Sequence, residues 1–312
     1  MNMLNLPKKV YFKRGAMNVS FKELTDIYAF KRAFIVSDAK LYAAGVAAPV
    51  VDFLRERGIR TAEFFTLSEV PTIADVKSGL PKMLEFEPEV IIAIGGGSVI
   101  SAAKAMWIQY ENPEIDLAEV AEKFGKLTGT DVGFPTVGAK AKLAVIPTTF
   151  GTGAQNSPFA VLADGDKKLV IASYKLLPEI SATDPEFADT MTPEMIKANA
   201  IALLSQAIRA YAAPGSNCYT QGVLAQAVMG ALNNAEAAMN GCPDAMYKLC
   251  NAGALLGYGV GNAVETIDPN AAAYPTAKEK GAEDPKVDAL AKDCGLADAE
   301  ALIAAVAAIA EL

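Results

Sequence analysis

Strand-like and helix-like segments alternate along the first 185 residues, and this alternation limits the fold more than any other feature of the sequence. Short apolar runs are each followed by a segment whose apolar residues recur at helical spacing. The predicted strands are 32–39, 61–67, 90–97 and 142–153, the last of which runs into a Thr- and Gly-rich turn. The predicted helices are 47–58, 73–86 with an interruption at Pro81, and a segment beginning at Ser98. This β-α-β-α order predicts a parallel, doubly wound sheet. Ligands of such sheets bind beyond the carboxyl ends of the strands.

The second part of the chain has a different character. Residues 159–173 predict a hairpin and 180–187 a last short strand, after which no strand pattern returns. Thr192 followed by Pro193 is typical of a helix start. Ala-rich helices are predicted to about residue 265, then a polar connector over 268–286 and two short helices with a turn at 294–298. We therefore expect an α/β domain over 1–187 and an all-helical domain over 188–312.

The chain contains no histidine, and its net charge is -8. The first fact excludes catalytic sites that need an imidazole, such as a Ser-His-Asp triad or a HExxH zinc site. The acidic balance, with scattered Lys and Arg, argues against a nucleic-acid partner. Proton transfers in an enzyme of this composition would use Asp, Glu, Lys, Tyr, Cys or water.

No targeting signal is expected. The first residues lack the apolar core of a signal peptide, and no apolar run reaches the roughly 18 residues of a membrane helix. The four cysteines, all beyond residue 217, lack CxxC spacing and are interpreted as thiols in a reducing compartment. These features predict a cytoplasmic protein that does not enter a membrane.

The junction 90–98, VIIAIGGGS, is the first candidate binding site. Glycine lets the backbone approach a ligand closely, and the free N–H groups at the start of a helix attract an anion. The pattern is not the GxGxxG fingerprint of ordinary dinucleotide sites. Lys104, nearly two turns into the same helix, is interpreted as a surface lysine.

Taken with IPTTFGTGAQNSPFAV at 146–161, the segment GGGSVISAAK resembles the iron-dependent alcohol dehydrogenase family. Further matching segments are KVYFKRGAMN, FIVSD, AAKAMWIQYENPE, YKLLPEISATDPEF and AIRAYAA, so the resemblance covers nearly the whole chain. It is strongest to the alcohol dehydrogenase half of the bifunctional aldehyde-alcohol dehydrogenases. The resemblance implies a dinucleotide-binding domain, a helical domain, and a divalent metal that polarises an alcohol or aldehyde oxygen during hydride transfer to or from nicotinamide.

By matched position, the resemblance also implies residues that contact NAD. Gly95, Gly96, Gly97 and Ser98 would hold the pyrophosphate, Asp38 the adenosine ribose, and Thr148, Thr149, Thr152, Ser157 and Lys168 other parts of the nucleotide. A carboxylate at the ribose favours NAD over NADP because it repels a 2′-phosphate. Three departures alter the expected affinity: Ser101 replaces an acidic residue of the family, the turn 150–155 reads FGTGAQ, and the hairpin before Lys168 is about two residues short.

The metal ligands that the family carries are not found. The resemblance implies an Asp and, one helical turn later, a His; aligned on AIRAY, these positions hold Ala202 and Gln206. Two further histidines of the family would follow GVGNAV at 259–264, where several dozen residues are missing in the alignment. We therefore expect a shortened helical domain without bound metal.

Three functions remain open. The first is a family member that binds NAD but is catalytically impaired and acts as a binding or assembly protein; self-association is expected from apolar surface left by the deletion. The second is an active alcohol or aldehyde oxidoreductase with a metal-free or rebuilt site. Its acids would be Lys168 or a tyrosine such as Tyr211 or Tyr258, and candidate cation ligands are Asp184, Glu186, Glu265 and Asp268. The third is a shortened descendant without a selected function. No substrate and no catalytic residue can be assigned.

Overall fold

The computed structural model describes residues 4–268 and 284–312, which form two compact units. The α/β unit comprises 7–148 and 158–187, and the helical unit comprises 188–268, 284–312, the turn 149–157 and residues 4–6. The sequence boundary at 187 had placed the turn and the first residues with the α/β part. The turn joins the helical unit because its backbone packs closely against glycines of a helix there, as described below.

A parallel sheet of six strands forms the centre of the α/β unit, which confirms the predicted doubly wound architecture. The strand order is β1-β8-β5-β4-β2-β3. The strands are β1 (Lys9–Phe12), β2 (Arg32–Asp38), β3 (Arg60–Leu67), β4 (Val90–Gly95), β5 (Lys142–Pro147) and β8 (Ile180–Thr183). The chain runs outward from β2 to β3, then returns to place β4 on the other side of β2. The order of winding therefore reverses between β2 and β4.

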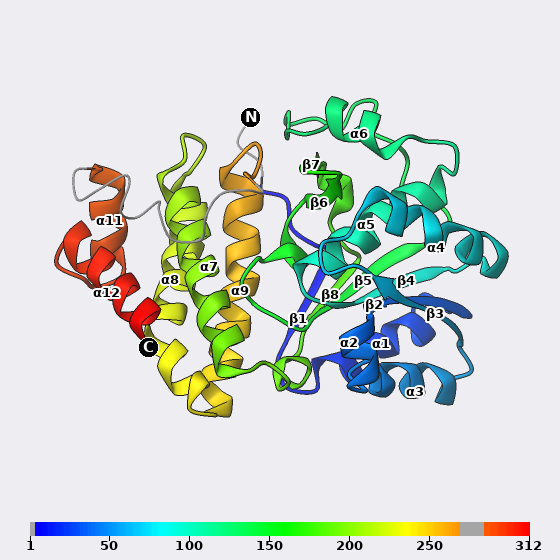
Figure 1. Ribbon diagram of the computed structural model, residues 1–312, viewed down its shortest axis with the longest axis horizontal. Coiled ribbons are helices and arrows are strands. Elements are labelled where there is room, and N and C mark those ends of the chain that lie inside the picture. Colours follow the sequence, from blue (N-terminus) through cyan, green and yellow to red (C-terminus); the bar gives the residue numbers. More distant parts are fainter. Residues whose placement is uncertain (1–3, 269–283) are drawn as a thin grey trace. The chain divides into compact units, whose positions relative to one another are not determined.

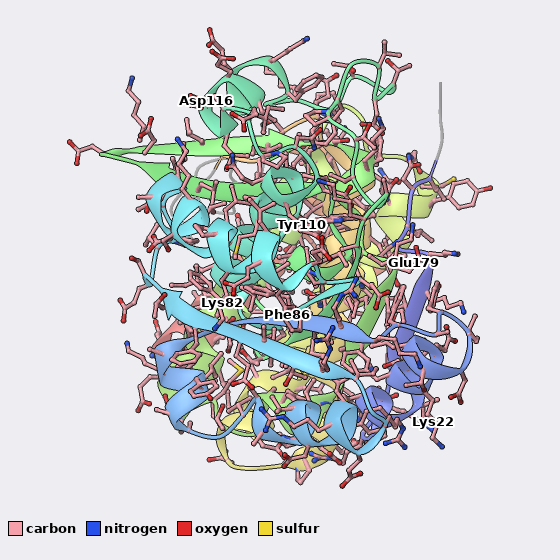
Figure 2. All side chains as sticks on the ribbon, turned by 90° about the vertical axis from the view of Figure 1, so that its right-hand side faces the viewer. Lys22, Lys82, Phe86, Tyr110, Asp116 and Glu179 are labelled. Carbon is pink, nitrogen blue, oxygen red and sulfur yellow. The ribbon has the colours of Figure 1, made fainter. Side chains whose placement is uncertain are left out.

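Helices cover both faces of this sheet (Figure 1). Alternate strand residues, such as Ile35 and Ile92, pack with α1 (Ala16–Asp26) and α3 (Ala48–Glu56) on one face. The other face is covered by α4 (Ile73–Phe86) and α5 (Gly97–Glu111). Figure 2 shows Lys82 and Phe86 of α4 and Tyr110 of α5 on one side of the sheet and Lys22 of α1 on the other. Two short helices, α2 (Ala39–Ala43) and α6 (Leu117–Lys123), also belong to the α/β unit.

Two local details differ from the sequence prediction or extend it. Helix α4 continues through Pro81 instead of breaking there. The carbonyl that loses its partner belongs to Lys77, which lies on the exposed side of the helix where water can replace the bond. The predicted hairpin is present as β6 (Phe159–Asp164) and β7 (Lys167–Ala172), paired antiparallel.

The helical unit is built on α7 (Pro193–Ala212), α8 (Cys218–Met239) and α9 (Pro243–Ala263), with α11 (Pro285–Asp293) and α12 (Ala299–Glu311) packed on α7 and α8 (Figure 1). Thr192 caps α7 through a bond from Met195 N, as the Thr-Pro start signal predicted. At the other end, Lys286 Nζ donates to the carbonyls of Ala212 and Ala213. Within the described residues, none of the helices combines the length and apolarity that crossing a bilayer needs.

Candidate functional site

The point where the winding of the sheet reverses brings together the ends of β2 and β4. Asp38 ends β2 and Gly95 ends β4, so both lie at the carboxyl edge where ligands of doubly wound sheets bind. The buried Ser37 hydroxyl donates to the Ile94 carbonyl over 2.8 Å and ties the two strand ends together. Ser37 was not predicted as a site residue, although a hydroxyl in an otherwise apolar strand was a readable signal.

The glycine turn between β4 and α5 presents the start of a long helix to solvent. Gly96 is the N-cap and no side chain caps the helix, so the first N–H groups lack an intrahelical or side-chain partner. Ser98 is exposed and there is no acidic residue in the first turn. Packing also favours glycine at position 95, because a Cβ there would lie 2.5 Å from Val99 Cβ. The turn therefore offers uncapped donors and a partial positive charge to an anion.

Thr148 borders the same turn from the neighbouring strand. Its backbone N–H donates to the Gly95 carbonyl over 3.0 Å, and the residue is buried. Because β5 pairs with β4 up to Pro147, this bond continues the ladder by one step and fixes where the turn begins. Ser37 and Thr148 thus hold the glycine turn from both sides.

Asp38 already has a structural task. Its Oδ1 accepts a hydrogen bond of 2.9 Å from Leu41 N, which caps α2. A carboxylate can accept about four hydrogen bonds, so the cap leaves capacity for ribose hydroxyls. The side chain is partly exposed at the sheet edge, which fits the predicted ribose contact.

Lys168 lies on the hairpin rather than on the sheet. It is exposed on β7, opposite Ala163 of β6. Ala163 N donates to the Pro71 carbonyl over 2.8 Å, which joins the hairpin to the loop between β3 and α4. That loop also leaves the carboxyl end of a strand, so Lys168 belongs to the same edge of the unit as Asp38.

The structure corrects the interpretation of Lys104 as a surface residue. Lys104 is fully buried and its Nζ donates to the Phe159 carbonyl over 2.9 Å. Burial lowers the pKa of this amine to about 7. Every residue of α5 from Val99 to Tyr110 is buried, and a helix that is apolar on all sides predicts such burial. This signal was present in the sequence.

The remaining predicted residues lie in the helical unit, on the turn 149–157. Thr149 is partly buried, Thr152 is exposed and accepts a weak bond from Ala154 N at 3.4 Å, and Ser157 is buried. The structure therefore brings Asp38, the glycine turn, Thr148 and Lys168 together in one unit, and assigns Thr149, Thr152 and Ser157 to the other.

Comparison with known proteins now decides the family. Residues 7–185 match the model of the family described as iron-containing alcohol dehydrogenase. This chain belongs to the iron-containing alcohol dehydrogenase family. A curated relative, aldehyde-alcohol dehydrogenase 2 of Entamoeba histolytica, is 36% identical over 267 residues, which are 84% of this chain and 30% of that protein. The chain thus spans under a third of the length of this relative.

Solved structures of the iron-containing alcohol dehydrogenase family share the fold. The enzyme of Thermococcus thioreducens matches with a TM-score of 0.86 at 22% identity, covering 99% of this chain and 85% of that one. Sulfoacetaldehyde reductase of Bifidobacterium kashiwanohense, solved with NAD+, matches with a TM-score of 0.83 at 19% identity, covering 99% and 85%. At these identities the likeness establishes architecture alone.

Iron and zinc are held in proteins by imidazole, thiolate and carboxylate groups. Of the positions matched to the family's Asp and His, Ala202 has no donor atom and Gln206 has a neutral carboxamide. Gln206 Nε2 donates to the carbonyls of Gly151 and Ala202, at 2.8 and 3.3 Å. Among residues 4–268 and 284–312, no three His, Cys, Asp or Glu side chains gather as a metal site would require. Neutral amides are poor ligands for iron or zinc.

One of the four acidic candidates for a rebuilt cation site has a structural function, and the other three are exposed. The buried Asp184 carboxylate accepts from the backbone N–H groups of Gly15, Met17 and Glu186, at 3.0–3.2 Å, and so holds the start of α1. Glu186 is exposed in the same unit, whereas Glu265 and Asp268 are exposed in the helical unit. The bonds of Asp184 favour a structural function over a cation site.

The two tyrosines considered as acids are poorly suited to give up a proton. Burial raises the pKa of the Tyr211 hydroxyl above its ordinary value, and a hydrogen bond to Asp293 raises it further. Burial raises the pKa of Tyr258 to about 12. A general acid works best with a pKa near the operating pH, so neither group matches that requirement.

Proposed function

We propose that this chain binds NAD(H) at the carboxyl edge of its parallel sheet. The exposed, uncapped start of α5 after the glycines supports this most directly, because it presents partly positive N–H groups where a pyrophosphate needs them. Asp38 would hold the ribose and disfavour a 2′-phosphate. Thr148 and Lys168 would contribute further contacts from the same unit.

We further propose that the chain does not carry out the metal-dependent alcohol oxidation for which its family is named. A metal that acts as a Lewis acid contributes several kcal/mol to stabilising a developing alkoxide. Ala202 and Gln206 offer no anionic or imidazole donor in place of the ligands that the family resemblance implies. Nicotinamide supplies hydride chemistry when bound.

The experiment that tests NAD(H) binding compares two charge substitutions. Ser98→Glu places a carboxylate at the exposed first turn of α5, where it favours the helix dipole but repels a pyrophosphate. We expect unchanged or slightly raised stability together with at least a tenfold rise in the Kd for NADH. This tenfold rise corresponds to about 1.4 kcal/mol. Ser78→Glu, at an exposed position of α4, is the matched control and should bind like the unmodified protein.

Thermal melts with NADH, NADPH, Fe²⁺ and Zn²⁺ complete the test. A ligand at 100 times its Kd adds about 2.7 kcal/mol to the stability of the native state. Stabilisation by NADH above that by NADPH, without any requirement for metal, is the expected result. Equal binding of NADH by the two glutamate variants would contradict the proposed site, and chelator-sensitive alcohol oxidation would contradict the proposed loss of metal chemistry.

A further inference from the structure

The loop that follows β3 meets helix α2 beside Asp38. In the parallel pairing of β2 with β3, Asp38 lies opposite Leu67, so the loop after β3 begins at the same edge of the sheet. Glu69 is the second residue of that loop, and its carboxylate forms an ion pair with the ammonium of Lys40. Two carboxylates and one ammonium therefore lie at the carboxyl ends of β2 and β3, all within the α/β unit.

Helix α2 holds Lys40 in a defined position on the sheet. Asp38 caps the start of the helix, and the Tyr42 ring stacks on Phe65 of β3, with 3.9 Å between the ring centroids and 11° between the ring planes. The Tyr42 hydroxyl also donates to the Glu63 carboxylate over 2.7 Å. Because α2 is fixed to both β2 and β3, the backbone of Lys40 has a fixed place at the ends of these strands.

The loop that carries Glu69 is fixed by the start of α4. Ser68 Oγ donates to Asp75 Oδ1 over 3.1 Å. Asp75 Oδ2 accepts from both the backbone N–H and the hydroxyl of Thr72, each over 2.7 Å. Glu69 lies between Ser68 and Thr72 in the sequence, so its backbone is held on both sides. The pairing of Lys40 with Glu69 therefore follows from two backbone positions that the fold sets.

Both carboxylates act on the Lys40 ammonium. The hydrogen bond and the charge of Glu69 raise the pKa of Lys40 above its ordinary value, and the charge of Asp38 raises it further. With Glu69 present, the three groups carry a net negative charge. Without it they would be neutral together, and the ammonium would be available to an anion. A lysine ammonium is a common partner of phosphate groups in proteins.

We propose that Glu69 is a specificity-determining residue for the coenzyme, because its ion pair withholds the Lys40 ammonium from a 2′-phosphate and so favours NAD(H) over NADP(H). The inference rests on the proposed NAD(H) function, in which Asp38 holds the ribose. Asp38 repels a 2′-phosphate directly, and Glu69 engages the cation that would offset this repulsion. Specificity is a difference between two affinities, and Glu69 acts on the affinity for the competing coenzyme.

The test removes the charge of Glu69 first and the ammonium second. Glu69→Gln keeps the shape of the side chain and releases Lys40, whereas the double variant Lys40→Met/Glu69→Gln removes both charges. Glu85→Gln makes the same change at an exposed position near the far end of α4 and serves as control. An exposed ion pair contributes little to stability, so all three variants should fold. Calorimetric titrations with NADPH and NADH are made at low ionic strength, where exposed charges are least screened.

The two coenzymes differ only in the 2′-phosphate, so the ratio of the Kd for NADPH to the Kd for NADH isolates its contribution. We expect the unmodified protein to bind NADH more tightly. The ratio should fall by about fivefold in Glu69→Gln, which is the upper end of what an exposed charge pair contributes. The double variant should return to within about twofold of the original ratio, and the control should keep that ratio.

The outcomes separate this inference from the proposed function. An unmodified protein that binds NADH, with a ratio that Glu69→Gln leaves unchanged, overturns the inference and leaves NAD(H) binding intact. A ratio that stays low in the double variant also overturns it, because the released ammonium is then not the cause. Equal affinity of the unmodified protein for the two coenzymes has the same consequence. If the unmodified protein binds neither NADH nor NADPH, the proposed function fails and the inference fails with it.

Discussion

The start of α5 and the middle of α7 both occupy positions where the family resemblance implies ligand contacts, yet their polar groups are used differently. At α5 the first N–H groups face solvent without a side-chain cap. On α7 the amides of Asn199 and Gln206 are bound to the chain's own backbone at Gly151. Polar groups that the protein leaves open indicate a binding site, whereas groups that it satisfies internally indicate a structural task. The comparison therefore supports the proposed ligand binding at α5 and indicates a structural function for this face of α7.

The largest effect is expected where the turn meets α9. Gly153 has a φ of +62°, and a Cβ there would lie 2.6 Å from Gly257 Cα. Gly153→Ala should lower the free energy of unfolding by about 3 kcal/mol, since left-handed strain and overpacking add. Urea unfolding measures this loss. Gly165→Ala has a similar φ of +57° but open space around it, and should lose only about 1 kcal/mol. Equal losses would show that packing against α9 matters little.

The next prediction concerns the buried part of α5. The pKa of Lys104 is about 7 in the folded protein against 10.5 for an unperturbed lysine. Between these values the unfolded chain binds more protons, so stability should rise as pH increases from 7 to 10.5 and be lowest below 7. Lys104→Met removes this titration. It should be the more stable protein at pH 6, by roughly 2 kcal/mol or more, and the difference should shrink by pH 9.

Lys22→Met, an exposed substitution on α1, provides the control for the pH series. Its urea midpoint should follow that of the unmodified protein at each pH. A parallel pH dependence in Lys104→Met and the unmodified protein would mean that the buried amine does not titrate in the folded state as described.

A smaller effect separates packing from binding within the glycine turn itself. Gly95→Ala brings a methyl group against Val99 and should lower stability by about 2 kcal/mol. Val99→Ala in the same chain should recover only the share of that loss caused by the two Cγ atoms, because the Cβ atom that lies 2.5 Å away remains. Because Gly95 is one of the glycines expected to hold the pyrophosphate, the affinity for ADP-ribose should stay reduced in the double variant although part of its stability returns. An affinity that recovers together with stability would show that Gly95 is needed for packing and not for contact with the ligand.

The smallest expected effect is on metal binding. The double variant Ala202→Asp/Gln206→His restores the two residue types that the resemblance implies on α7. The resemblance implies two further histidines, and the sequence contains none, so anaerobic Fe²⁺ or Zn²⁺ should not raise the melting temperature of the metal-stripped protein. A clear rise of the melting temperature at stoichiometric metal would contradict the purely structural function of α7, since α7 would then belong to a ligand site completed by other residues.

The alternation of strands and helices was sufficient to predict the parallel sheet, the hairpin and the start of α7 at Thr192. These features are set locally, by apolar periodicity and by capping residues. The continuation of α4 through Pro81 was not predicted, because the outcome depends on whether the lost bond faces water. The sequence also did not predict that 149–157 belongs to the helical unit, since this depends on glycines about 100 residues further along the chain.

The predictable part of the candidate site consists of residues whose position follows from the ends of strands. The glycines, Ser98 and Asp38 lie at strand ends that the sheet topology brings to one edge. Ser37 and Lys104 were missed because their importance comes from tertiary partners, the Ile94 and Phe159 carbonyls. The bond from Gln206 to Gly151 has the same character: spacing shows that residues share a helix face but not what that face meets.

The order of synthesis matters for a unit whose parts are separated in the chain. The turn 149–157 leaves the ribosome before any of the helices that fix it, and Gly257 follows Ser157 by 100 residues. At about 5–20 residues per second, that interval lasts roughly 5–20 s. During this time the turn is an unsupported loop between β5 and β6. A separately expressed segment 188–312 would lack the turn altogether, leaving the glycine face of α9 and the amides of α7 without the backbone they bind.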